Sequence, residues 1–259
     1  MARTHETPSE PRPWEPSLTR AIARALERLP TESPRSLLFS GGLDSGLLAW
    51  ELREDRTLVL STIGLEGSSD LAAAETAARP LGLPWSSHIV TESEVLSVAR
   101  KIEGETRDLG PTGRAVEVAF ALAVECAPPG VVLCGQGADE LFFGYAHLRG
   151  IDPAVAQRRA DADLEYLLTE AWPRARRIAS SAGRTIEAPY LAPEFIEAAR
   201  AIPLVERLAG PSPKQVLRNY ARRRGLPDVM ALRPKKALQY GTGIDRLLRR
   251  ESKRSDRST

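Results

Sequence analysis

The sequence predicts an α/β protein: a doubly wound parallel sheet with a helical C-terminal layer. Up to about residue 145, short apolar runs alternate with segments whose apolar residues recur at helical spacing. Strands that alternate with single helices build a parallel sheet with helices on both faces. After about residue 150 the pattern is helical only, so the second half is expected to wrap helices over the core within the same domain.

The two ends of the chain differ in composition from the part between them. Residues 1–16 are rich in proline and poor in apolar residues, which is typical of a flexible arm. Residues 246–259 are basic and polar, and we expect this tail to fray. Residues 17–245 are therefore predicted to form the folded domain. Its first helix is expected to begin behind a cap at Ser17 and to end at Pro30.

Four apolar runs between these ends are predicted to be strands. They are SLLFS (36–40), TLVLSTI (57–63), WSSHIV (85–90) and VVLC (131–134). A helical pattern separates each run from the next. The predicted helices pass through Leu47 and Leu52, through the alanine-rich segment 71–79 capped by Asp70, behind the capping-box pair Thr91 and Glu94, and through 114–126. Such crossovers are what parallel pairing requires.

Composition excludes several classes of protein. Hydrophobic residues make up 42% and charged residues 27% of the 259 residues, which is ordinary for a globular protein and excludes a wholly disordered chain. No apolar run approaches the roughly 18 residues that a membrane span needs, and no apolar signal segment is visible, so no membrane partner is expected. Cys126 and Cys134 are too few for a disulfide framework. A cytoplasmic location is the expectation that follows.

The net charge of +2 hides an asymmetry between the two halves. Residues 1–145 carry 13 basic and 21 acidic residues, a balance of −8, and residues 146–259 carry 23 and 13, a balance of +10. A basic half can mark a polyanionic partner, or it can solvate helices or face a phosphorylated ligand. Aromatic residues are only 5% and no RNA-binding module is recognisable, so nucleic acid is not the partner we expect.

The most informative segment is the loop after the first predicted strand, Ser40-Gly41-Gly42-Leu43-Asp44-Ser45. Its two glycines permit a tight turn, and the following helix directs N–H groups and the positive end of its dipole at a ligand. Asp44 would repel a phosphate unless it holds a magnesium ion that the phosphate also binds. The alternative is a structural turn in which Asp44 only caps the helix. A Walker loop is excluded because the chain contains no Gly-Lys pair.

A second acidic loop follows the fourth predicted strand, in Cys134-Gly135-Gln136-Gly137-Ala138-Asp139-Glu140. Parallel strands end at the same edge of a sheet, where ligands gather. Asp139 is therefore expected to meet Asp44, and sharing a magnesium ion would offset the repulsion between the two carboxylates. The alternative is that Asp139 caps a helix beginning at Ala138, a role compatible with metal binding.

The motif SGGxDS between a strand and a helix resembles the PP-loop of ATP pyrophosphatases. Together with GQGADELFFGY (135–145), it is similar to the synthetase domain of asparagine synthetases and β-lactam synthetases. Three further segments, 61–70, 188–203 and 213–243, resemble that domain in the same order, so the resemblance covers about residues 36–245. It implies an adenine nucleotide α-hydrolase-like fold and an enzyme that cleaves ATP between the α and β phosphates, adenylates a substrate and releases pyrophosphate.

The resemblance also implies roles for individual residues. Contacts with the nucleoside of ATP would come from Leu38, Ile63, Cys134 and Gly135, and contacts with the pyrophosphate from Ser40, Gly41, Gly42, Asp44 and Ser45. Asp44 and Asp139 would hold Mg²⁺. Lys235, in Arg233-Pro234-Lys235, matches the family's catalytic lysine, which would neutralise charge that builds on the α-phosphate. Its alternative is a solvated lysine in a basic run.

The sequence departs from the family on the acceptor side of the expected site. Gln136 stands where asparagine synthetases have a glutamate and β-lactam synthetases a tyrosine. We keep it as a catalytic-site candidate that orients a substrate through its amide, because glutamine cannot act as a general base near neutral pH. Ala192 and Glu187 replace an aspartate and an arginine. Ala2 stands where glutamine-dependent members have a nucleophilic cysteine, so nitrogen is expected from ammonia, a substrate amine or a separate glutaminase subunit.

These observations predict an ATP- and magnesium-dependent ligase. It would adenylate a small carboxylate and transfer the acyl group to ammonia or an amine, as asparagine synthetases do. Two alternatives stand beside this prediction. The basic second half would favour an RNA-modifying PP-loop enzyme. Gln136 and Ala192 would favour a nucleotide-binding pseudoenzyme or partner subunit without turnover.

Overall fold

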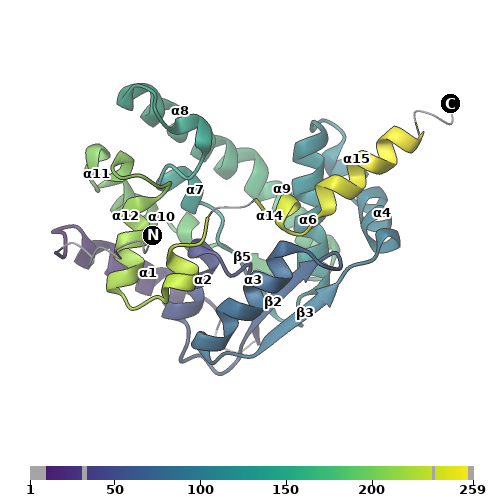
Figure 1. The fold of residues 1–259 in the computed structure, drawn as a ribbon, viewed down its shortest axis with the longest axis horizontal. Coiled ribbons are helices and arrows are strands. Elements are labelled where there is room, and N and C mark those ends of the chain that lie inside the picture. The colour runs from purple at the N-terminus through teal and green to yellow at the C-terminus, as the bar shows by residue number, and fades with distance from the viewer. Residues whose placement is uncertain (1–9, 31–33, 235–236, 256–259) are drawn as a thin grey trace, which may run out of the picture.

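The computed structural model describes residues 10–30, 34–234 and 237–255. Its centre is a sheet of five parallel strands in the order β3-β2-β1-β4-β5 (Figure 1). The strands are β1 (Arg35–Leu38), β2 (Leu58–Gly64), β3 (Trp85–Ile89), β4 (Val131–Leu133) and β5 (Thr185–Glu187). Every pairing is parallel, so the carboxyl ends of the strands share one edge. The predicted α/β class is confirmed.

Helices account for most of the remaining chain. In the first half they are α1 (Glu15–Glu27), α2 (Leu43–Glu51), α3 (Ser69–Ala78), α4 (Glu92–Lys101), α5 (Glu103–Thr106), α6 (Pro111–Cys126) and α7 (Ala138–Leu141). In the second half they are α8 (Pro153–Tyr166), α9 (Trp172–Ser181), α10 (Pro193–Arg200), α11 (Leu204–Leu208), α12 (Gln215–Arg223), α13 (Asp228–Ala231), α14 (Leu238–Gly241) and α15 (Ile244–Ser255). A π-helical turn, Leu167–Ala171, joins α8 to α9 without a break. None of the described helices combines the length and apolarity needed to cross a bilayer.

Each face of the sheet has its own apolar core, because alternate strand residues point to opposite faces. On one face, Leu37 and Leu133 belong to a cluster with residues of α1, α2, α3, α10, α12 and α13. On the other, Val132 and Ile186 belong to a cluster with residues of α4, α6, α9 and α15. The predicted helical C-terminal layer is therefore divided between both faces of a doubly wound sheet.

The structure adds a strand that the sequence pattern did not predict. β5 is three residues long, and only Ile186 in its middle is buried. Unlike the all-apolar β4, which has the same length, β5 contains a single apolar residue, so no apolar run separates it from the helical pattern around it. Its pairing with β4 extends the sheet by one strand and brings the following segment, from residue 188, to the carboxyl edge.

Both ends of the domain differ from the prediction. α1 begins at Glu15 rather than behind Ser17, because the buried Glu15 side chain binds Arg223 of α12. Two residues assigned to the arm thus belong to the first helix. At the other end, α15 covers most of the segment that was expected to fray, because Leu247 packs into the core. Residues 1–9 and 256–259 lie outside the described residues.

The predicted capping box is present at the start of α4. The N–H of Glu94 donates to Thr91 Oγ1 at 3.2 Å, and the N–H of Thr91 donates to Glu94 Oε2 at 2.6 Å. This backbone hydrogen bond and the one from the Thr91 hydroxyl lower the pKa of Glu94 to about 2. Local sequence therefore determines where this helix begins.

Candidate active site

A cavity of about 550 Å³ opens at the carboxyl edge of the sheet. It lies where the strand order reverses between β1 and β4, the switch point at which ligands bind in doubly wound sheets. Its lining comes from the ends of β1, β2 and β4, from α6, from α8 and the π-helical turn, and from the regions around α12 and α14. The volume suits a small-molecule ligand.

The loop between β1 and α2 is shaped by its two glycines. Gly41 has a φ of +71°, and a Cβ there would lie 2.7 Å from the carbonyl oxygen of Ala73, so only glycine allows the loop to pack on α3. Gly42 precedes α2 in an extended conformation. The first turn of α2 then lines the cavity together with Ser40, whose N–H lies 3.4 Å from Ser45 Oγ. A helix start of this kind binds anions.

Asp44 and Asp139 meet at one point, and Lys214 occupies it. Lys214 Nζ donates to Asp44 Oδ2 at 2.6 Å and lies 2.6 Å from Asp139 Oδ1. The lysine is 4% exposed, whereas about a quarter of each carboxylate side chain is open, 28% and 24% respectively. Burial by itself lowers the pKa of Lys214, but the two carboxylates outweigh burial and raise the pKa above its usual value. Lys214 is therefore a cation held between two acids.

Backbone geometry directs Lys214 into the site. It stands immediately before α12 with a φ of +56°, a left-handed conformation that is uncommon outside glycine. Gly144 leaves the room that this side chain needs, because a Cβ at that position would overlap Asp139 Oδ1 and Lys214 Cε. The N–H of Gly144 donates to the carbonyl oxygen of Asp139 at 2.8 Å. The acidic loop and the start of α12 are thus fitted to one another.

Two largely buried side chains, those of Tyr190 and Arg233, hold the backbone of the PP-loop by hydrogen bonds. The hydroxyl of Tyr190, which has no exposed surface, donates to the carbonyl oxygen of Asp44 at 2.8 Å. Arg233 donates to the carbonyl oxygen of Ser40 and, at 2.8 Å, to Asp70 Oδ1. The predicted cap Asp70 therefore lies inside the first turn of α3 as the buried partner of Arg233. Segments distant in sequence thus hold the loop in place.

The predicted catalytic lysine, Lys235, lies outside the described residues, and its role stays a prediction. The described residues on either side of it, Pro234 and Ala237, line the cavity. Arg233 fixes the chain just before it to the PP-loop.

The pair of acids suits a magnesium ion. Within the described ranges, no group of three or more His, Cys, Asp and Glu side chains is arranged to hold a metal. Mg²⁺ usually takes one or two carboxylates and completes its coordination with phosphate oxygens and water. Asp44 and Asp139 offer two carboxylates that already share one cation, the ammonium group of Lys214. Their chemistry therefore fits an ion that arrives with a nucleotide.

Comparison with known proteins assigns this chain to a family. The model of the asparagine synthase family matches residues 17–162 and 152–257. The chain belongs to the asparagine synthase family.

Relatives of this asparagine synthase family chain include a putative glutamine-hydrolyzing asparagine synthetase from Methanocaldococcus jannaschii. It is 30% identical over 284 aligned positions, which cover 92% of this chain and 51% of the relative. Glutamine-hydrolyzing asparagine synthetase 2 of Oryza sativa is 31% identical over 233 positions, 82% of this chain and 39% of the relative. The chain thus spans about half or less of the length of these relatives.

Two solved structures align with this chain at low overall similarity. An NH3-dependent NAD synthetase from Campylobacter jejuni aligns with a TM-score of 0.37 and 14% identity, over 67% of this chain and 93% of that one. An NMN synthetase from Francisella tularensis aligns with a TM-score of 0.35 and 10% identity, over 92% of each chain.

The site residues predicted for this asparagine synthase family chain gather around one cavity. Its lining includes Leu38, Ser40, Gly42, Asp44, Ser45, Ile63, Cys134, Gly135, Gln136 and Asp139. Among the predicted site residues that the structure describes, Gly41 is the exception, because it turns the loop against α3 and does not line the cavity. Gln136 Oε1 is buried and has no hydrogen-bond partner among the described residues, so its amide is available to a ligand. The contacts with ATP themselves stay predictions.

Lys214 and Glu117 are among the charged residues of this family member's cavity that sequence reasoning missed. Lys214 is one of many basic residues in the second half, and only its place in the segment 213–243 set it apart. Glu117 also lines the cavity. It is an acid within the otherwise mostly apolar run Ala115–Val124, which is a signal that could have been used. Neither residue has a local partner that would reveal its position.

The two cysteines of this family member are expected to be unreactive. Burial raises the pKa of Cys126 to about 11 and that of Cys134 to about 12. Because the thiolate is the nucleophile, we expect both native thiols to react with iodoacetamide at pH 8 more than about a hundredfold more slowly than free cysteine. Mass spectrometry of intact protein over time measures this. Rapid single labelling of the native protein would contradict it, and urea-unfolded protein, which should label twice, is the control.

Proposed function

We propose that this chain is an ATP- and magnesium-dependent amide-forming ligase. The observation that carries the proposal is the convergence of Asp44 and Asp139 beside the PP-loop, with Lys214 between them. A helix start that binds anions, two acids that suit magnesium and a buried cation together make a site for a pyrophosphate group. Membership in the asparagine synthase family supports the same chemistry.

Each group has a physical task in this scheme. The N–H groups at the start of α2, with the hydroxyls of Ser40 and Ser45, would hold the departing phosphates. Lys214 would neutralise charge on them, and Lys235 would do the same at the α-phosphate. Asp44 and Asp139 would hold Mg²⁺, which supplies further positive charge when bound. The nucleoside would lie against the apolar and backbone surface of Leu38, Ile63, Cys134 and Gly135.

The proposed reaction has two steps. In the first, a carboxylate oxygen of the substrate bonds to the α-phosphorus of ATP, the bond to the bridging oxygen breaks, and pyrophosphate leaves. In the second, a neutral amine nitrogen bonds to the acyl carbon, the acyl bond to AMP breaks, and the nitrogen loses a proton to solvent. The products are an amide, AMP and pyrophosphate. Gln136 would orient the acceptor through its amide without acting as a base.

Ammonia or an amine is the proposed nitrogen source. Either compound supplies the neutral nitrogen nucleophile that the second step requires. Ammonia delivered by a separate glutaminase subunit would serve the same second step. The proposed small-molecule partners are therefore a carboxylate and either ammonia or an amine.

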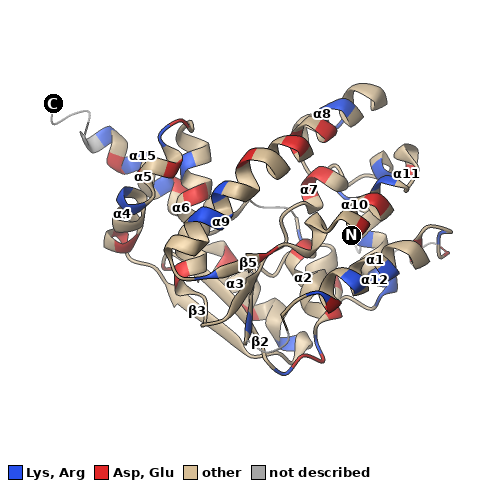
Figure 2. Ribbon diagram, turned by 180° about the vertical axis from the view of Figure 1, so that it is seen from behind, with Lys and Arg blue, Asp and Glu red and all other residues tan. Residues whose placement is uncertain are grey.

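The arginine run of α12 argues against an RNA substrate. Arg222 pairs with Asp228 at 2.7 Å, Arg223 pairs with Glu15, and Arg224 pairs with Glu51 at 2.9 Å. Figure 2 shows basic and acidic positions interspersed over the helices around α1 and α12. Arginines already neutralised by carboxylates contribute little to phosphate binding. The excess basic residues of the second half thus largely make contacts within the fold.

Analysis of the products formed from ATP tests the proposal. The protein would be incubated with Mg²⁺, ATP, ammonium and a panel of carboxylic acids that includes aspartate, and the products identified by mass spectrometry. We expect AMP and pyrophosphate in equal amounts with at least one acid, together with its amide. Asparagine would identify aspartate as the substrate.

Two outcomes would contradict the proposed ligase. Formation of ADP and phosphate would show cleavage at a different bond of ATP. Magnesium-dependent ATP binding without pyrophosphate release, with ammonium or an alkylamine and any acid of the panel, would favour the nucleotide-binding partner subunit. RNA that co-purifies with the protein and dissociates as salt rises would favour the RNA-modifying alternative.

A further inference from the structure

The outer part of the cavity contains a carboxylate that the proposed ATP chemistry does not use. α6 precedes β4 and runs back from the carboxyl edge of the sheet, so its first half stands above that edge. Glu117, Phe120 and Ala123 line the cavity from successive turns of α6. Glu117 comes before Ala123 in α6 and lies about 9 Å nearer the start of the helix, at about 1.5 Å per residue along the axis. Glu117 therefore lines the part of the cavity nearest the start of α6.

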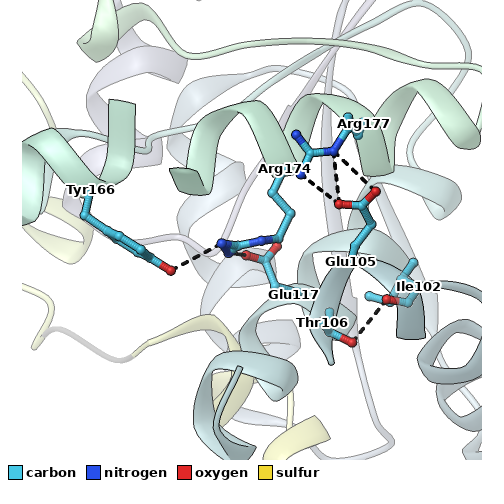
Figure 3. Close-up of polar contacts among 7 residues, drawn as sticks. All are labelled: Ile102, Glu105, Thr106, Glu117, Tyr166, Arg174 and Arg177. Atoms are coloured by element: carbon cyan, nitrogen blue, oxygen red, sulfur yellow. Dashed lines mark hydrogen bonds and ion pairs between the residues drawn. The ribbon is translucent and has the colours of Figure 1, made fainter. Parts of the chain in front are cut away.

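Arg174 of α9 holds Glu117 in place (Figure 3). Its Nη1 donates to Glu117 Oε1 at 3.0 Å, and its Nη2 donates to the Tyr166 hydroxyl at 3.3 Å. Glu117 is 8% and Arg174 9% exposed, but only Glu117 and Tyr166 of these three line the cavity. Burial raises the pKa of Glu117, and Arg174 acts in the opposite direction. The Glu117 carboxylate thus lines the cavity, whereas its counter-ion, the Arg174 guanidinium, does not.

The wall around Glu117 is apolar. Val116 and Phe120 flank it on α6, and Leu167 and Ala171 line the cavity from the π-helical turn between α8 and α9. Such turns are rare local widenings of a helix and occur frequently at functional sites. This one places two apolar side chains four residues apart on the same cavity. A hydrocarbon group would therefore pack beside the Glu117 carboxylate.

The charges of the described lining favour a cationic group in this region. Its acids are Asp44, Asp70, Glu117, Asp139, Glu140 and Asp163. Its lysine and arginine side chains are Lys214, Arg218 and Arg233. Lys214 and Arg233 bind acids beside the PP-loop, and Arg218 donates to backbone carbonyls in the same area. Arg174 lies outside this lining and offsets the charge of Glu117, so the carboxylate itself, rather than an excess of negative charge, is the partner that an ammonium group would meet.

We propose that Glu117, oriented by Arg174, selects the nitrogen donor of the ligation as a primary amine with a hydrocarbon part. The ammonium group pairs with Glu117 and the hydrocarbon packs on the wall formed by Val116, Phe120, Leu167 and Ala171. The bound ammonium group loses one proton to solvent before the neutral nitrogen attacks the acyl carbon. Glu117 is thus a specificity-determining residue of the acceptor side. This inference rests on the proposed ligase function and names the class of its second substrate.

Binding of three probes of one size and different charge tests the inference. Butylammonium, 1-butanol and butyrate would be titrated by calorimetry into protein saturated with Mg²⁺ and α,β-methylene-ATP. We expect butylammonium to bind about tenfold or more tightly than either other probe, since hydrogen bonds to charged groups contribute on that scale. Glu117→Gln should abolish this preference.

Matched variants separate recognition from a structural role. Glu105→Gln is the control, because Glu105 binds Arg177 of the same helix α9 at 2.9 Å but does not line the cavity (Figure 3). It should keep the preference for butylammonium. The double variant Glu117→Gln with Arg174→Gln leaves no buried charge unpaired, so it guards against misfolding of the single variant. It should also lose the preference.

The nucleotide titration keeps the two proposals apart. Failure of α,β-methylene-ATP to bind with Mg²⁺ would overturn the proposed function itself. If the analogue binds but butylammonium shows no preference over butanol and butyrate, only the inference about Glu117 fails. A preference that survives in the double variant would likewise overturn it.

Discussion

Replacing Asp139 with asparagine is expected to lower pyrophosphate release by at least about a hundredfold, the scale on which single electrostatic groups of active sites act. The change removes one of the two negative charges that would hold Mg²⁺, while the side chain keeps its size. Lys214 would remain beside Asp44, 2.6 Å away in the present structure, and would no longer be shared. Both the affinity for the ion and the position of the lysine should therefore change.

Steady-state assays of Asp139→Asn with the acid identified by product analysis measure this effect. Asp161→Asn is the matched control, because Asp161 on α8 pairs with Arg200 at 2.6 Å and does not line the cavity. The control should retain wild-type rates. Raising the magnesium concentration should recover part of the activity of Asp139→Asn if the loss arises from weaker ion binding. Retention of more than about a tenth of the rate at ordinary magnesium concentration would contradict the assigned role.

Replacing Lys214 with methionine is expected to destabilise the ligand-free protein by roughly 2–4 kcal/mol. Removing one partner of a buried ion pair typically costs about 3–5 kcal/mol, and the partial exposure of the two carboxylates lowers that figure. Asp44 and Asp139 would then lose the ammonium group that they share. Mg²⁺ should bind between them and restore part of the lost stability, whereas in the wild-type protein without nucleotide the ammonium group already lies between the two acids.

Urea unfolding with and without Mg²⁺ measures this difference. Lys101→Met is the control: Lys101 also lies 2.6 Å from a carboxylate, that of Glu125, but 47% of its side chain is exposed. Surface pairs of this kind contribute about 0–1 kcal/mol, so the control should lose little stability and gain nothing from Mg²⁺. A Lys214→Met protein as stable as the wild type, or one indifferent to Mg²⁺, would show that the two acids do not form a cation site.

Much of the fold could be predicted because its signals are local. The first four strands and the helices between them follow from apolar runs and apolar periodicity, and the start of α4 follows from the pair Thr91 and Glu94. β5 was not predicted because only one of its three residues, Ile186, is apolar. The start of α1 was not predicted, because the buried contact of Glu15 with Arg223 joins residues far apart in the chain and gives no local sequence signal.

The candidate site likewise has features that the sequence predicts and features that it does not. The sequence by itself determined the PP-loop, whose glycines and following helix are consecutive, and the meeting of Asp44 with Asp139, because both follow strands of one parallel sheet. Only the tertiary structure decided that Lys214 lies between them and that Glu117 faces the cavity with Arg174 behind it. The physical reason is that a charge acts through its distance in space to its partners, whereas sequence patterns describe only neighbours along the chain.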